Sequence, residues 1–301
     1  MTAKARPAET PPMKSFRLPG GRRVWNAAGA RLDTRFLYRE MFVRRSYEKH
    51  GIAIRPGDTI FDVGANIGMF ALSLAGRFRD LRIYCFEPVP GTFACLQRNL
   101  AEWRLPSGCE IAALNFGLGA AEGQTTIEFF PEAPSNATLY SAEKHRDFAK
   151  VLDAVHFRDL WKANRLRALF YLPLYPLRKI LLGRLYARML AAGVSIPCQL
   201  RTLSGVLEER RVERIDLLKI DVEGAEMDVL AGIEERHWPL IRQLSMEVEP
   251  ANKPRVPALL ERLRSLGFAR IALESIVGGP SHLKDEIACN IYATRVSEPR
   301  P

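Results

Sequence analysis

Short apolar runs alternate with stretches of helical periodicity over most of this 301-residue chain. Runs such as TIFDV, RIYCF and IDLLKI are predicted strands, because each is short, apolar and rich in β-branched or aromatic residues. The predicted strands span 59–63, 82–86, 110–116, 124–130, 196–203, 215–220, 243–248, 268–273 and 287–293. The predicted helices span 31–51, 67–76, 91–103, 226–232 and 254–266. Such alternation indicates an α/β fold with a mostly parallel sheet, in which the final strand pair forms a hairpin edge.

This alternation breaks at about residue 141. From 144 to 193 the chain has helical, basic character and no strand signal. We therefore expect a helical insertion at 141–195 inside one domain that spans 26–301. Residues 1–25 are rich in Pro, Lys and Arg and are predicted to form a loose leader.

Composition narrows the class of protein. Hydrophobic residues make up 47% of the chain and charged residues 26%, which is typical of globular domains. The sequence contains no apolar run long enough to span a bilayer and no secretory signal, so we expect a cytoplasmic protein. The five cysteines are scattered and lack a C-x-x-C pair. This favours free thiols over disulfides or a zinc site.

The net charge of +10 gathers in the insertion, where eleven basic residues stand against three acidic ones between Lys144 and Arg188. The plainest interpretation is that the insertion forms a helical lid over a ligand-binding cleft of the domain and exposes its basic face to solvent. Two other interpretations give the segment 144–190 a partner: an acidic acyl carrier protein or an anionic membrane surface. Nucleic acid is not expected, because the rest of the chain is nearly neutral and carries no recognition motif.

The first strand–turn–helix corner carries the main chemical signal, with Asp62 just before a turn that contains Gly64 and Gly68. A dinucleotide site would have the spacing G-x-G-x-x-G, and here Asn66 replaces the middle glycine. A carboxylate at Asp62 would repel a diphosphate and attract a cation. S-adenosylmethionine carries an ammonium and a sulfonium but no phosphate, so the corner favours that cofactor. Ala65 completes the turn.

The next strands extend this cofactor site. Glu87 ends the second strand, where a carboxylate can accept both ribose hydroxyls of an adenosine. Pro88 fixes the loop that follows, and Val89 is expected to lie against the adenine. At the end of the third strand, the residues expected to read the adenine edge are Asn115, Gly117 and Leu118.

Two later strand ends are acidic. The predicted buried strand at 215–220 is followed by Asp221, Glu223 and Glu226. Lys219 is the counter-charge within this segment. Glu226 can also cap the next helix. The neighbouring strand ends with Glu247 and Glu249, and Glu249 is the one expected to be exposed. The candidate general bases are Asp221, Glu223 and Glu247. A less favoured alternative is a magnesium ion held by the same three carboxylates.

The stretches FDVGANIGMF, FEPVP, IDLLKIDVEGAEMDVLAGI and MEVEP together resemble the FkbM family of S-adenosylmethionine-dependent methyltransferases. The resemblance implies a class I, Rossmann-like fold, a mostly parallel sheet with one antiparallel edge strand, and methyl transfer mostly to oxygen. It also implies that the cofactor is held by Asp62, Gly64, Asn66, Gly68 and Glu87. An acidic corner is implied at Asp221, Glu223 and Glu226.

The sequence departs from this family pattern in two places. Glu249 stands where many members have a histidine, and about fifty extra residues separate the segment near 130 from the strand near 200. We expect an O-methyltransferase of a small-molecule hydroxyl, such as a polyketide or peptide intermediate, free or bound to a carrier protein. The alternatives are a membrane-associated methyltransferase of a glycolipid or polysaccharide, and a non-catalytic module that binds an adenosine ligand.

Overall fold

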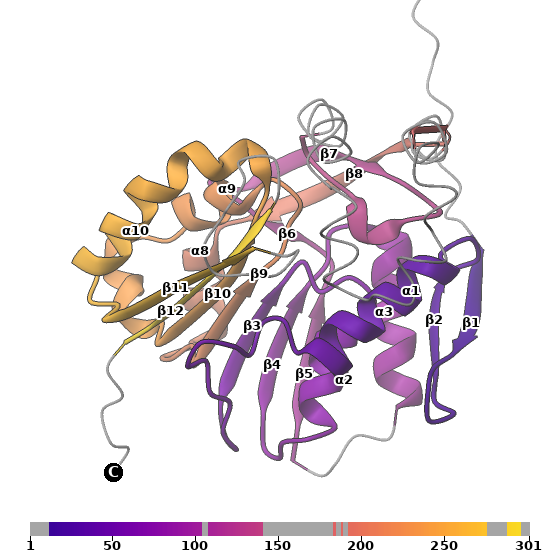
Figure 1. Ribbon diagram of the computed structural model, residues 1–301, viewed down its shortest axis with the longest axis horizontal. Coiled ribbons are helices and arrows are strands. Elements are labelled where there is room, and N and C mark those ends of the chain that lie inside the picture. Colours follow the sequence, from indigo (N-terminus) through magenta and orange to yellow (C-terminus); the bar gives the residue numbers. More distant parts are fainter. Residues whose placement is uncertain are drawn as a thin grey trace, which may run out of the picture.

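The computed structural model describes residues 12–103, 108–140, 192–275 and 288–295, together with positions 183, 184 and 188. A seven-stranded sheet with the order β11-β12-β10-β9-β3-β4-β5 forms its centre (Figure 1). The strands are β3 (Thr59–Val63), β4 (Arg82–Phe86), β5 (Glu110–Leu114), β9 (Leu217–Ile220), β10 (Gln243–Val248), β11 (Arg270–Ser275) and β12 (Cys289–Thr294). The predicted Rossmann-like fold is confirmed. Its single antiparallel strand is β12, which pairs with both β10 and β11 and so lies one strand in from the edge.

Helices cover both faces of the sheet. On one side lie α1 (Arg31–Tyr38), α2 (Met69–Ala75) and α3 (Pro90–Glu102), and on the other lie α8 (Leu203–Arg210), α9 (Glu226–Ala231) and α10 (Val256–Ser265) (Figure 1). Alternation along β3 serves both layers, because Ile60 joins the core beneath α2 whereas Phe61 and Val63 join the core beneath α8–α10. By the same alternation Asp62 faces the α2 side. The short helical turns are η2 (Pro134–Asn136), η4 (Glu235–Leu240) and η5 (Pro250–Arg255).

A second, three-stranded sheet has the order β6-β8-β7 and consists of β6 (Gly117–Leu118), β7 (Gly123–Phe129) and β8 (Val194–Arg201). The strands expected at 124–130 and 196–203 therefore form, but they pair with each other instead of extending the main sheet. Helix α8, for which the sequence analysis gave no helical signal, follows β8 directly. Its Thr202 side chain accepts a hydrogen bond from the Gly205 N–H and caps the helix.

The N-terminal segment corrects one prediction. A loose leader over residues 1–25 is wrong from Met13 onward, because β1 (Met13–Arg17) and β2 (Arg23–Ala27) form an antiparallel hairpin. The Asn99 side chain holds this hairpin to α3, accepting from the Trp25 N–H at 2.6 Å and donating to the Trp25 carbonyl at 3.0 Å. Residues 1–11 lie outside the described residues.

The structure shortens one further prediction and leaves another outside the described residues. The helix expected over 31–51 ends earlier, because α1 continues as a π-helical turn, η1 (Arg39–Arg44), and Arg45 then takes a left-handed conformation with φ 49°. The predicted insertion at 141–195 lies almost wholly outside the described residues, so its helical lid stays a prediction. Within the described part of the chain, no helix is both long and apolar enough to cross a membrane.

Candidate functional site

A cavity opens at the carboxyl ends of β3, β4 and β9, where parallel α/β sheets usually bind ligands. Its volume is about 860 Å³ when the space open to solvent is counted. Apolar side chains enclose it from two directions: Leu37 and Met41 come from α1 and η1, and Ile127 and Leu200 come from the second sheet.

The turn after β3 is closed by its own hydrogen bonds. The N–H groups of Gly64 and Ala65 both donate to the Phe86 carbonyl, at 3.1 and 2.9 Å. The Asn66 N–H donates to the Glu87 carboxylate at 3.0 Å. In a dinucleotide site such N–H groups face the pyrophosphate. Here they are already used, so the turn offers no cradle for a diphosphate.

Gly64 and Gly68 have different reasons to be glycine. Gly64 has φ 76°, and a Cβ there would lie 1.8 Å from the Asp221 carbonyl oxygen, so only glycine allows β3 and β9 to end this close together. Gly68 has φ 86° and starts α2, and it does not line the cavity. Its role is to aim the turn and not to contact a ligand.

Glu87 lies in the cavity wall and is almost fully buried. Besides the Asn66 N–H, its carboxylate accepts the Val89 N–H at 2.9 Å. Burial raises the pKa of Glu87 to about 7 even though these hydrogen bonds and Lys219 act to lower it. The side chain is thus held rigidly where the sequence analysis expected the ribose acceptor.

Asn115 has a different role from the expected one. Its side-chain amide donates to the Glu87 carbonyl at 2.9 Å and to the Pro88 carbonyl at 3.3 Å, and the residue does not line the cavity. The prediction that Asn115 reads the adenine edge therefore lacks support from the geometry. The residue instead fixes the loop that carries Glu87.

Asp62 also requires correction, because it faces the protein interior instead of the cavity. Asp62 and Lys219 are paired neighbours on β3 and β9, both buried, with Lys219 Nζ 2.9 Å from Asp62 Oδ1. Lys219 Nζ also lies 3.7 Å from Asp221 Oδ2 and donates to the Gly64 carbonyl at 2.9 Å. Asp62 thus pairs with Lys219 in the interior, and of the two aspartates beside Lys219 it is Asp221 that lines the cavity.

A tyrosine joins two of the predicted acids. The Tyr47 hydroxyl donates to Asp221 at 2.7 Å, and the same oxygen lies 3.2 Å from Glu247. Burial and then the charge of Asp221 raise the pKa of Glu247 well above its usual range. Glu247 does not line the cavity, so it reaches the site only through Tyr47. Tyr47 is itself positioned by its neighbour, since the Tyr292 hydroxyl of β12 donates to the Ser46 carbonyl at 2.5 Å.

The remaining acidic residues shape the loop after β9. Glu223 lines the cavity with φ 52°, and its carbonyl accepts the Thr138 hydroxyl at 2.6 Å. Glu226 is buried and accepts the Gly224 N–H at 2.7 Å and the Asn252 amide at 2.6 Å. Burial raises the pKa of Glu226 to about 7. Glu226 thus holds the loop together from inside, whereas Glu223 lines the cavity.

The structure therefore sorts the predicted site residues into two groups. Those that line the cavity are Gly64, Ala65, Asn66, Glu87, Pro88, Val89, Gly117, Leu118, Asp221 and Glu223. Those that support it from behind are Asp62, Gly68, Asn115 and Glu247. The sequence analysis missed Tyr47, because it placed this residue within the predicted helix 31–51, whereas Tyr47 lies in an irregular segment after η1.

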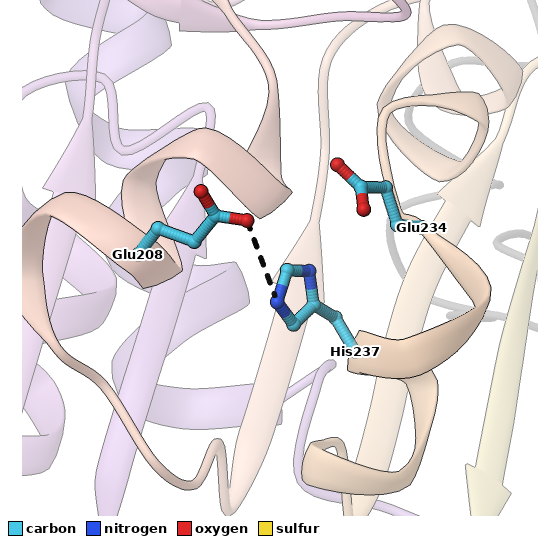
Figure 2. A group of neighbouring side chains, drawn as sticks. All are labelled: Glu208, Glu234 and His237. Atoms are coloured by element: carbon cyan, nitrogen blue, oxygen red, sulfur yellow. Dashed lines mark ion pairs between the residues drawn. The ribbon is translucent and has the colours of Figure 1, made fainter.

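A group of possible metal ligands lies elsewhere, in the segments that lead into β9 and β10. Glu208, Glu234 and His237 bring ligand atoms within 4.8 Å of one another (Figure 2). However, the Arg236 guanidinium pairs with both carboxylates, at 2.8 Å to Glu234 and more closely to Glu208. The His237 ring also bonds Ser204 at 2.8 Å. Both carboxylates share the Arg236 guanidinium and the His237 ring is bonded to Ser204, so we interpret this group as an ion-pair network.

Comparison with known proteins adds to this geometry. A family model described as the methyltransferase FkbM domain matches residues 62–269. The chain is 34% identical over 260 residues to the 31-O-demethyl-FK506 methyltransferase FkbM of Streptomyces tacrolimicus, covering 86% of this chain and 90% of that protein. It is 33% identical over 242 residues to methyltransferase sdnD of Sordaria araneosa, covering 77% and 82%. It is 34% identical over 284 residues to the AMB antimetabolite synthetase AmbE of Pseudomonas aeruginosa, covering 92% of this chain but 12% of that much longer protein.

Substituting Lys219 tests whether the buried pair holds the site together. Lys219→Met leaves the Asp62 charge buried without its partner and should lower the free energy of unfolding by about 3–5 kcal/mol. The double variant Asp62→Asn with Lys219→Met removes that charge and should regain part of the loss. Lys49→Met breaks a partly exposed ion pair with Glu274 and should cost under about 1 kcal/mol. Urea denaturation measures all three; an equal, small cost for Lys219→Met and Lys49→Met would contradict the assignment.

The raised pKa of Glu226 predicts a pH dependence of stability. Between about pH 5 and pH 7 the folded state keeps a proton on Glu226 that the unfolded chain has released, so stability should fall as the pH rises. The contribution is up to about 3 kcal/mol. Glu226→Gln should flatten the curve of unfolding free energy against pH, whereas the exposed control Glu110→Gln should leave its slope as in the wild type. An unchanged slope in Glu226→Gln would show that this carboxyl titrates normally.

Proposed function

This chain belongs to the FkbM family of methyltransferases, and from that premise we propose that it is an S-adenosylmethionine-dependent O-methyltransferase of a natural-product intermediate. The observation that carries the cofactor assignment is the turn after β3. Its N–H groups are satisfied by the Phe86 carbonyl and the Glu87 carboxylate, while acidic side chains line the cavity beside it. A positively charged, phosphate-free adenosine compound fits these groups, and a diphosphate does not.

The residues that would hold S-adenosylmethionine are those of the cavity wall. Glu87 offers carboxylate oxygens to ribose hydroxyls, and Val89 and Leu118 offer apolar surface to an adenine ring. The carboxylates of Asp221 and Glu223 would attract the positively charged ammonium and sulfonium groups of the cofactor. When bound, the cofactor supplies a methyl group already activated on a positively charged sulfur. The protein then has to position an acceptor oxygen, exclude water and remove a proton.

We assign the proton removal to Asp221, with Tyr47 and Glu247 behind it. Asp221 lines the cavity and accepts the proton of the acceptor hydroxyl. Tyr47 passes its own hydroxyl proton to Glu247 and takes the new one from Asp221, so Asp221 returns to a carboxylate. This transfer uses the ionised form of Glu247, and the path follows the distances from the Tyr47 hydroxyl, 2.7 Å to Asp221 and 3.2 Å to Glu247. Lys219 Nζ lies 3.7 Å from Asp221 Oδ2 and places a positive charge beside the base.

The relatives support the acceptor class. One is named as acting on an oxygen of 31-O-demethyl-FK506, and another as an antimetabolite synthetase. We therefore propose a hydroxyl of a polyketide or peptide intermediate, either free or tethered to a carrier protein. The apolar walls from Leu37, Met41 and Ile127 suit such an acceptor. We also keep the cytoplasm as the proposed compartment, because all five cysteines are free thiols.

Cofactor binding tests the first half of this proposal. The wild type should bind S-adenosylmethionine and S-adenosylhomocysteine in isothermal titration calorimetry and should not bind NAD. Glu87→Ala should weaken S-adenosylhomocysteine by about tenfold or more, because ribose hydroxyls lose their acceptor. Glu110→Ala, exposed at the start of β5, is the matched control and should bind as the wild type does. Tight NAD binding, or undisturbed affinity in Glu87→Ala, would overturn the cofactor assignment.

Turnover tests the second half. Transfer of a labelled methyl group to a panel of hydroxylated macrolides and peptides should identify an acceptor for the wild type. On that acceptor Tyr47→Phe should lower kcat by about tenfold to a hundredfold and change the pH profile of kcat, since it breaks the link from Asp221 to Glu247. The KM for S-adenosylmethionine should stay within about twofold. Tyr84→Phe, a tyrosine of β4 outside the cavity wall, should retain full activity; equal kcat values for the two variants would exclude the relay.

A further inference from the structure

A second hollow, of about 1290 Å³ including open space, lies between β1 with its following turn and α1. Five basic side chains line it, and we call it the basic groove: Lys14, Arg17, Arg31, Arg35 and Arg39. The three arginines of α1 and η1 are spaced by one helical turn each, so they form a row along one side. Phe16 and Tyr38 are half-buried within the groove.

The charge of the basic groove is not compensated within the described part of the chain. No acidic residue lines the groove there, and none of its five basic side chains takes part in a described ion pair. The acids of the same helical segment are used elsewhere. Asp33 is buried and bonds Asn26 and Ser135, and Glu40 pairs with Arg44 at 2.7 Å. A partner entering the groove would therefore meet five unopposed positive charges.

The helical segment that carries the arginines also lines the cofactor cavity. Leu37 and Met41 point into that cavity, while Arg35 and Arg39 border the basic groove. The buried Asp33 joins α1 to Ser135, another residue of the cavity wall. Whatever occupies the groove is therefore separated from the cavity by the width of a single helix.

The shape and the rim of the groove favour a protein over a membrane. A flat bilayer surface cannot enter a hollow, whereas a helix with acidic side chains can lie in it. The outer shoulder of α1 exposes Leu32 at 74% and Phe36 at 57%, which adds apolar contact beside the arginines. Arginine and aromatic residues are enriched in protein interfaces, where the planar guanidinium can bind a carboxylate with two hydrogen bonds.

We propose that the basic groove docks an acidic carrier protein, which presents a tethered acceptor to the cavity one helix away. This proposal rests on the proposed function for the identity of the tethered cargo. The recognition itself rests only on charge and shape, so it can be measured without turnover. The residues of the basic groove lie outside the basic segment 144–190 of the sequence.

The test is a binding experiment with the full-length protein and a purified acidic holo-acyl carrier protein of fatty-acid synthesis. Because the proposed recognition is electrostatic, such a generic carrier protein is a fair probe. The wild type should bind it in biolayer interferometry at about 50 mM salt, and affinity should fall at least tenfold at about 300 mM. The triple variant R31E/R35E/R39E should bind at least about tenfold more weakly than the wild type.

A matched control changes the net charge equally at three exposed arginines outside the groove. R79E/R255E/R270E should keep the affinity of the wild type for the carrier protein. Circular dichroism and S-adenosylhomocysteine binding should be the same in all three proteins. If the wild type binds no S-adenosylhomocysteine, the proposed function fails while the docking result still stands on its own.

Three results would overturn the docking proposal. The first is no measurable binding of the carrier protein to the wild type. The second is an equal loss of affinity in both triple variants, which would make net charge the cause. The third is binding of vesicles of phosphatidylcholine and phosphatidylglycerol that R31E/R35E/R39E abolishes while the carrier protein stays unbound, which would assign the groove to a membrane.

Discussion

The buried contact between Lys219 and Asp62 is the interaction on which the site depends. A lysine in the middle of a parallel sheet is unfavourable unless its charge is met, and Asp62 on the neighbouring strand meets it at 2.9 Å. Burial alone would lower the pKa of Lys219, but Asp62 and Asp221 raise it, so the ammonium stays charged. That fixed positive charge lies 3.7 Å from Asp221, which lines the cavity. Asp62 therefore influences the ligand site through Lys219, without lining the cavity itself.

The backbone N–H groups of the turn after β3 are satisfied within the protein, and this limits which ligands the turn can bind. Glu87 accepts the N–H of Asn66, and the Phe86 carbonyl accepts those of Gly64 and Ala65, so the turn is complete without a phosphate. The same glutamate lines the cavity, where it can accept hydroxyl groups. The Glu87 carboxylate thus has two roles: it occupies a backbone N–H that could otherwise bind a phosphate, and it lines the ligand cavity.

Much of this fold and site could be predicted from the sequence, because strand ends leave local signals. Apolar runs gave the strands, and acids or glycines directly after them gave Gly64, Glu87, Asp221 and Glu223. What could not be predicted depends on contacts distant in sequence. Nothing near Tyr47 shows that residue 221 will be its partner, and the sequence around Asn115 does not show that its amide will turn back to the loop after β4. The burial of Asp62 against Lys219 could not be predicted either, because the two residues become neighbours only when β9 pairs with β3.

The hydrogen bond from Tyr292 to the Ser46 carbonyl makes the position of Tyr47 depend on a strand that is distant in the sequence. Ser46 and Tyr47 are separated by 174 residues or more from three side chains that hold them: Asp221, Glu247 and Tyr292. A nascent chain that has not yet paired β12 with β10 lacks the last of these supports. The full set of these contacts forms only once β9, β10 and β12 are all paired in the central sheet, so Tyr47 is positioned late in folding.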